Sequence, residues 1–121
     1  MTAAGLIVVL DNKILMVTRR SGKIAIPGGK SEIYEHPLET AIRETYEETG
    51  LVCHVPYPGR YYIHPNIDGM SFSAWKAKPI AGYLFSGEGN PFWLELEIFK
   101  RIPNVLEYPE WSKVAIEYFE L

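Results

Sequence analysis

The first quarter of the chain alternates short apolar runs with turn residues. Residues 6–10 and 14–17 are β-branched or aliphatic, and the polar segment 11–13 separates them. Such residues favour strands, so the pattern predicts two strands joined by a tight turn. A third apolar stretch at residues 24–26 ends at one proline and two glycines, residues 27–29. These three residues allow a sharp loop and a close approach of backbone segments.

The hydrophobic pattern changes its period after residue 36. Apolar or small side chains recur three and four positions apart, and charged side chains occupy the positions between them, as in an amphipathic helix. Pro37 suits the first turn of a helix, and Gly50 suits the position just beyond its end. We therefore expect a helix over Pro37–Thr49, with a buried face formed by Leu38, Ala41, Ile42, Thr45 and Thr49.

The second half of the chain predicts further strands and a closing helix. Aromatic and β-favouring residues dominate segments 60–64, 70–80 and 82–85, and segment 66–69 carries a turn signal. Helical spacing returns at Trp111, Val114, Ala115, Tyr118 and Phe119. Strands before, between and after helices indicate an α/β sandwich. With 121 residues and no internal repeat or linker, we expect one domain over residues 1–121.

Composition and charge narrow the classes of function. Hydrophobic residues make up 47% of the chain and charged residues 22%, which is typical of a soluble globular protein. The net charge of −3 offers no basic surface for duplex nucleic acid or an anionic membrane. The apolar run at residues 3–10 is too short to span a bilayer, and no export signal is visible. The single Cys53 cannot form an internal disulfide. We therefore expect a cytoplasmic monomer or homodimer, with Cys53 as a small core residue.

Three glutamates gather on one turn of the predicted helix. Glu47 and Glu48 lie three and four positions after Glu44. The three side chains therefore flank a single edge of the helix. Like charges this close repel one another, and a divalent cation would remove that cost. Magnesium prefers such hard oxygen ligands and often sits between carboxylates and substrate phosphates. The alternative is a solvated acidic face in which Arg43 bonds Glu47 at i,i+4.

The flanking residues favour the metal site. Residues 29–51 match the fixed positions of the Nudix box with Gly29, Glu35, Arg43, Glu44, Glu47, Glu48 and Gly50, and Leu51 closes it. If each fixed residue has a frequency of roughly one in fifteen, this match arises by chance about once in 10⁸ starting positions. The chain therefore resembles the Nudix (MutT-like) hydrolase family, in its order of elements as well as in the motif. Thr45 stands where the motif has an aliphatic residue. We expect its methyl group to pack and its hydroxyl to bond a carbonyl one turn back.

The resemblance implies a fold, a cofactor and a site. The fold would be a Nudix-type α/β/α sandwich with a mixed β-sheet, in which the motif forms a loop-helix-loop. The cofactor would be Mg²⁺, with Mn²⁺ possible. By motif position, the metal ligands would be Glu44, Glu47, Glu48 and the carbonyl oxygen of Gly28. Glu35 would support the site from behind the ligands, and Arg43 would orient a catalytic glutamate, since a guanidinium fixes carboxylate geometry.

Residues outside the motif supply further candidates. Glu88 lies in a glycine-flanked loop and could be the general base, as in some family members, or a solvent-facing turn residue. Arg19 and Arg20 follow a predicted strand and could bind substrate phosphates, or could be exposed strand-end cations. Trp75, Tyr83 and Phe85 could stack on a base, although aromatic residues in strands are more often core.

The implied reaction is attack of water on one phosphorus of a diphosphate. The short chain favours a nucleoside triphosphate or a small nucleotide derivative as substrate. The alternatives are ADP-ribose or another sugar nucleotide, a dinucleoside polyphosphate, and a capped RNA end. A Nudix-fold module that binds a nucleotide without cleaving it is a different class of function, but such modules usually lose motif glutamates that this chain retains.

Overall fold

The sheet is built around one strand that is buried along most of its length. In the computed structural model, which describes residues 2–56, 59–85 and 89–121, strand β1 (Thr2–Leu10) pairs in parallel with β7 (Met70–Gly82) over seven residues. On its other side it pairs antiparallel with β4 (Gly28–Lys30) near its start and with β2 (Lys13–Thr18) at its end. The predicted β1–β2 hairpin is thus confirmed.

The remaining strands extend the sheet on both sides of β1. β3 (Ile24–Ala25) and β8 (Phe92–Glu95) pair with β2, whereas β5 (Leu51–His54) and β6 (Tyr61–Ile67) pair with β7. The main path runs β3-β2-β1-β7-β5. Parallel and antiparallel pairs occur together, so the expected mixed sheet is confirmed.

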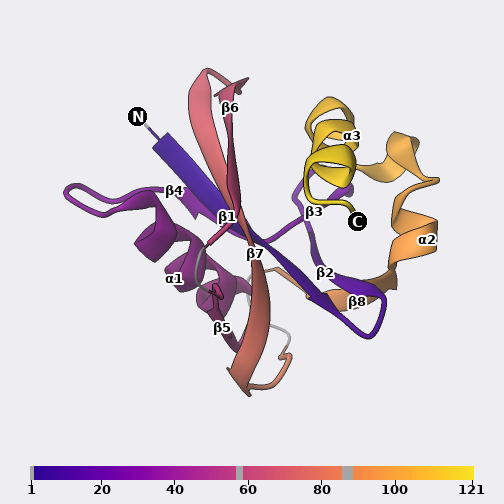
Figure 1. Ribbon diagram of the computed structural model, residues 1–121, viewed down its shortest axis with the longest axis horizontal. Helices are drawn as coiled ribbons and strands as arrows, with labels where there is room; N and C mark the ends of the chain where they lie inside the picture. Colours follow the sequence, from indigo (N-terminus) through magenta and orange to yellow (C-terminus); the bar gives the residue numbers. More distant parts are fainter. Residues whose placement is uncertain (1, 57–58, 86–88) are drawn as a thin grey trace.

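Helices cover both faces of the sheet (Figure 1). The helix α1 (Pro37–Thr49) lies on one face, and α3 (Pro109–Tyr118) lies on the other with the short α2 (Leu96–Phe99) and the 3₁₀ turn Pro103–Val105. Alternate residues of β1 point to opposite layers: Leu6 and Val8 share a core with Ala41, and Ile7 shares one with Trp111. The predicted α/β/α sandwich is confirmed. None of the helices in the described ranges is long and apolar enough to cross a membrane.

The ends of α1 follow from its sequence. The ring of His36 accepts a hydrogen bond from the Leu38 N–H at 3.1 Å, and the Glu39 carboxylate accepts one from the His36 N–H at 3.0 Å. These bonds satisfy N–H groups that have no partner within the helix. Gly50 ends α1 with a φ of 85°, a left-handed conformation that glycine adopts without a steric cost. The helix spans the predicted residues.

Some predicted boundaries are wrong. Segment 82–85 is not a separate strand, because β7 continues to Gly82 and residues 83–85 form no regular element. Segment 27–29 is more than a loop, since Gly28 and Gly29 belong to β4 and pair with β1. A Cβ on Gly28 would lie 2.6 Å from the Ala4 carbonyl oxygen, so the expected close backbone approach is confirmed. The short elements β5, β8 and α2 were not predicted.

Candidate active site

The buried face of α1 fixes which way its charged residues point. Thr45 and Thr49 are fully buried, and each hydroxyl donates to the carbonyl one turn back, Thr45 to Ala41 at 2.7 Å and Thr49 to Thr45 at 2.6 Å. The expectation for Thr45 is therefore confirmed. With this face against the sheet, the opposite edge of α1 carries Arg43, Glu44 and Glu47 toward the loop before the helix.

Arg43 joins four acidic or carbonyl partners at this edge. Its Nε and Nη2 donate to the two oxygens of Glu35 at 2.7 and 2.9 Å, and its Nη1 donates to Glu44 and to Glu47, both at 3.0 Å. Nη2 also donates to the Lys30 carbonyl at 3.3 Å. The Arg43 guanidinium, the Glu32 N–H and the Thr40 hydroxyl together lower the pKa of Glu35 to about 2. Glu35 is thus a charged anchor that holds Arg43 against the other two carboxylates.

Glu48 turns away from this group and lies under the helix. Its side chain is only 10% exposed, and both of its oxygens are engaged. Oε1 accepts from the Gly28 N–H at 2.9 Å, and Oε2 accepts from Nη1 of Arg19 at 2.6 Å. Burying a carboxylate requires such partners. Sequence spacing put Glu48 on the edge with its neighbours, whereas the structure shows it between α1 and the turn at Gly28.

Glu44 sits in a tight space next to Gly29. A Cβ on Gly29 would lie 2.6 Å from Cδ of Glu44, so any larger residue here would displace this carboxylate from its present position. Burial is the main cause of the raised pKa of Glu44, which Arg43 opposes and the charges of Glu48 and Glu47 reinforce. The three motif carboxylates therefore lie close enough to influence one another.

The donor chemistry of these residues fits a hard divalent cation. Three carboxylates and the Gly28 carbonyl are oxygen ligands of the kind that Mg²⁺ and Mn²⁺ take, and Gly29 leaves the space that Glu44 fills. Within the described residues, however, no three acidic, histidine or cysteine side chains are grouped so as to hold an ion. Arg43 and Arg19 neutralise the carboxylates instead. The repulsion that the sequence attributes to a metal site is thus also offset by two arginines.

The structure separates the two predicted phosphate-binding arginines. Arg19 is 26% exposed and donates to Glu48, to the Ile26 carbonyl at 3.0 Å and to the Gly28 carbonyl at 3.3 Å. Arg20 is exposed, and in the described part of the chain it has no hydrogen bond or ion pair. Glu88 lies outside the described residues, so its role stays a prediction. Trp75 is buried in the core, as an aromatic residue in a strand commonly is, and Tyr83 is exposed.

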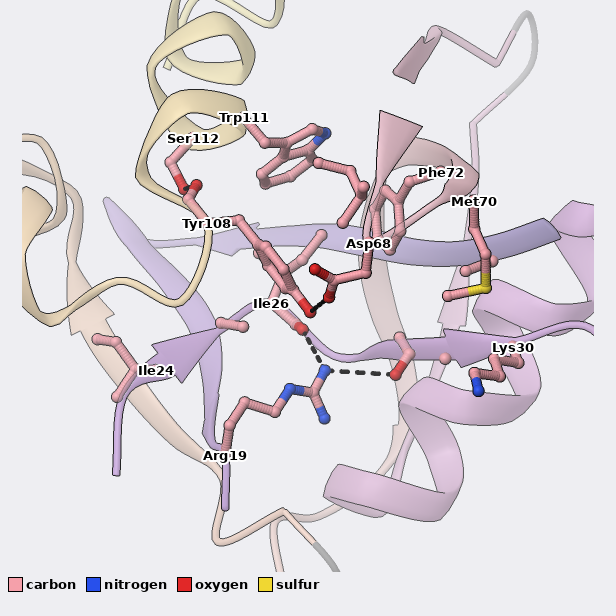
Figure 2. A pocket seen from close by; sticks show the side chains of 15 residues that line it. Arg19, Ile24, Ile26, Lys30, Asp68, Met70, Phe72, Tyr108, Trp111 and Ser112 are labelled. Atoms are coloured by element: carbon pink, nitrogen blue, oxygen red, sulfur yellow. Dashed lines mark hydrogen bonds between the residues drawn. The ribbon is translucent and has the colours of Figure 1, made fainter. Parts of the chain in front are cut away.

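A cavity of about 230 Å³ adjoins Gly28, Gly29 and Arg19. Figure 2 shows Ile26, Phe72 and Trp111 around it, and Arg19 at one end. At its edge the Tyr108 hydroxyl donates to Oδ2 of Asp68 at 3.0 Å, as Figure 2 also shows. The buried Nε1 of Trp111 has no hydrogen-bond partner among the described residues. Sequence reasoning missed this cavity, because Asp68 and Tyr108 are 40 positions apart and no motif links them.

Comparison with known proteins finds similar sequences and folds. The NUDIX domain family matches residues 1–105. An ADP-ribose pyrophosphatase of Methanocaldococcus jannaschii is 40% identical over 62 residues, which are 48% of this chain and 37% of that protein. The chain thus matches little more than a third of that relative's length.

Many solved structures share the fold, and two of them illustrate the similarity. A Caenorhabditis elegans Ap4A hydrolase in a binary complex has a TM-score of 0.74 at 20% identity, over 98% of this chain and 96% of that one. A bifunctional NMN adenylyltransferase/ADP ribose pyrophosphatase from Francisella tularensis, complexed with AMP and a manganese ion, has a TM-score of 0.69 at 19% identity, over 98% of this chain and 41% of that one.

Proposed function

Since the chain belongs to the NUDIX family, we propose that it is a hydrolase that cleaves the phosphoanhydride bond of a nucleoside diphosphate linked to a further group. The relatives support this class, because ADP-ribose and Ap4A both contain a nucleoside attached through such a bond. A nucleoside triphosphate belongs to the same class. The observation that carries the proposal is the contact of Arg43 with Glu35, Glu44 and Glu47 beside Gly29, next to a cavity.

The proposed roles follow the contacts of each side chain. Glu44, Glu47, Glu48 and the Gly28 carbonyl would hold divalent metal, with Mg²⁺ as the first choice and Mn²⁺ as a substitute. Arg43 would set the positions of Glu44 and Glu47, because a guanidinium held by the bidentate Glu35 contact has little freedom to turn. The metal would supply neutralisation of phosphate oxygens and acidification of water. Glu88 remains the candidate general base, and Arg20 a candidate phosphate contact.

The cavity is the proposed site for the organic part of the substrate. At about 230 Å³ it is smaller than the roughly 300 to 1,000 Å³ of sites that enclose a whole drug-sized ligand. It therefore suits one ring system, such as a nucleobase, with the phosphates extending toward Gly28 and Gly29. Its aromatic and aliphatic lining favours stacking, and the Asp68 carboxylate at its edge can accept a hydrogen bond from a base amine.

The test is hydrolysis of a panel of nucleotides with the purified protein. ADP-ribose, Ap4A, a UDP-sugar and the nucleoside triphosphates are incubated with Mg²⁺, with Mn²⁺ or with EDTA, and the products are separated by chromatography. We expect at least one compound to be split at its phosphoanhydride with either metal and none with EDTA. A panel without metal-dependent cleavage would contradict the proposed function.

A pair of matched variants tests the proposed residues. Glu47→Gln removes one charge from the group around Arg43, and we expect a fall in kcat of at least about a hundredfold, the scale of losing one preorganised electrostatic group. Glu117→Gln makes the same chemical change on the exposed surface of α3, where the Glu117 side chain has no partner among the described residues, and should match the wild type. Equal rates in all three proteins would contradict the ligand assignment.

A further inference from the structure

The Arg19 side chain forms hydrogen bonds with two of the proposed metal ligands. Arg19 donates through Nη1 to Oε2 of Glu48 and through Nη2 to the Gly28 carbonyl, with a further bond from Nη2 to the Ile26 carbonyl. Glu48 and Gly28 are 20 positions apart in the chain, and the Gly28 N–H to Glu48 bond brings them together. Arg19 therefore fills, with its guanidinium, a place between two oxygen ligands.

Each oxygen of Glu48 already accepts one hydrogen bond while Arg19 is bound. One oxygen is held by the backbone N–H of Gly28, which belongs to β4 and cannot move without breaking the pairing with β1. The other oxygen is held by the Arg19 side chain, which can change rotamer and is partly exposed to solvent. For Glu48 to bind a metal ion, Arg19 is the partner that can leave.

We propose that Arg19 and the divalent metal compete for Glu48 and Gly28, so that metal binding releases Arg19 toward the substrate phosphates. Two positive charges on one buried carboxylate would repel each other, so a bound metal ion disfavours the guanidinium at this position. Arg19 also lines the cavity (Figure 2), as does Gly28, whose carbonyl accepts a hydrogen bond from Arg19. The released guanidinium is then next to the place proposed for the diphosphate, where a planar fork of donors binds phosphate oxygens well.

This exchange rests on the proposed metal-dependent function and adds an order of events to it. With Arg19 on its ligands, the buried Glu48 carboxylate has a cationic partner in the absence of metal, which offsets part of its desolvation penalty. With metal present, the same arginine adds positive charge beside the substrate. Arg19 is thus a positioning residue for Glu48 in one state and a proposed substrate contact in the other.

The test measures Mn²⁺ binding by electron paramagnetic resonance in the nucleotide-free protein. Arg19→Gln removes the competing cation, and we expect Mn²⁺ to bind about tenfold more tightly, within the range of about 5 to 150-fold typical of coupled binding. Arg20→Gln removes the same charge from the neighbouring exposed position and should leave Mn²⁺ affinity as in the wild type. Unchanged or weaker Mn²⁺ binding in Arg19→Gln, or no Mn²⁺ binding in either protein, would overturn the competition.

A second measurement uses the wild-type chain, in case Arg19→Gln does not fold. The Nε–H signal of Arg19, identified in ¹⁵N NMR spectra by its loss in Arg19→Lys, should shift on saturation with Mg²⁺, while that of Arg20 should not. An unmoved Arg19 signal at Mg²⁺ saturation would refute the exchange. Tighter Mn²⁺ binding in Arg19→Gln without cleavage of any panel compound would leave the exchange standing and remove the proposed function. Metal-dependent cleavage of a panel compound, with equal Mn²⁺ affinities in the wild type and Arg19→Gln, would support the proposed function and refute the exchange.

Discussion

Replacing Glu35 by glutamine should weaken the fold in a pH-dependent way. The pKa of Glu35 falls from 4.5 to about 2, chiefly through its two hydrogen bonds from Arg43. At roughly 1.4 kcal/mol per pH unit, this shift sets an upper bound of about 3 kcal/mol on its stabilising effect. Since the Arg43 side chain is 25% exposed, solvent screening reduces the expected loss in Glu35→Gln to about 1 to 2 kcal/mol at pH 7.

The loss of stability in Glu35→Gln should be larger at neutral pH than at acidic pH. A carboxyl whose pKa is lowered by folding stabilises the native state fully above its unfolded pKa of 4.5, and this contribution disappears as the pH falls toward 2. Urea unfolding followed by tryptophan fluorescence at pH 7 and at pH 3 should therefore show a smaller difference between wild type and Glu35→Gln at pH 3. Glu32→Gln is the control, because Glu32 is 69% exposed and 3.8 Å from Arg43. A deficit in Glu35→Gln that is equal at both pH values, or no deficit at all, would refute the reasoning.

Two further variants and one labelling experiment test individual residues. Gly29→Ala introduces a Cβ that would lie 2.6 Å from Cδ of Glu44, so we expect a fall in kcat of at least about tenfold with a far-UV spectrum like that of the wild type; an unchanged kcat would contradict the contact. Thr45→Val removes one side-chain hydrogen bond to a carbonyl that α1 already uses, and its unfolding free energy should stay within about 1.5 kcal/mol of the wild type. Burial raises the pKa of Cys53 to about 11, so a thiol reagent at pH 8 should react quickly only in urea.

The sequence predicted the elements that are specified by residues close together in the chain. The helix Pro37–Thr49 has a buried stripe, a proline in its first turn and a glycine beyond its end, and each signal acts within a few residues. β5 has only four residues and follows Gly50 directly, so no turn cluster marks its start. It is a strand because β7 pairs with it, with the register shifting between Val52 and Cys53. Such pairing is a tertiary effect that four residues do not encode.

The contacts of the site also divide into those that nearby residues specify and those that depend on the tertiary fold. The motif spacing predicted that Arg43 could reach Glu47, and the two side chains are bonded at 3.0 Å. It did not predict that Arg19 bonds Glu48, 29 positions away. That contact depends on the residue after β2, the start of β4 at Gly28 and the end of α1 coming together, and no periodicity within any one of these elements specifies it. The cavity that Phe72 and Trp111 line likewise depends on β7 and α3 coming close enough for these two rings to make contact.

Charge compensation explains why a helix can carry these glutamates before any ion binds. Repulsion among Glu44, Glu47 and Glu48 requires nearby positive charge, but it does not specify the source of that charge. Arg43 is held by Glu35 and therefore stays in place, whereas two of the three groups that hold Arg19, Glu48 and the Gly28 carbonyl, are proposed metal ligands, and the third is the Ile26 carbonyl. One arginine is thus a fixed part of the site and the other is exchangeable. With the proposed exchange, this acidic cluster keeps Glu48 paired with Arg19 when no metal is bound, and Glu48 becomes available to an ion when Arg19 leaves.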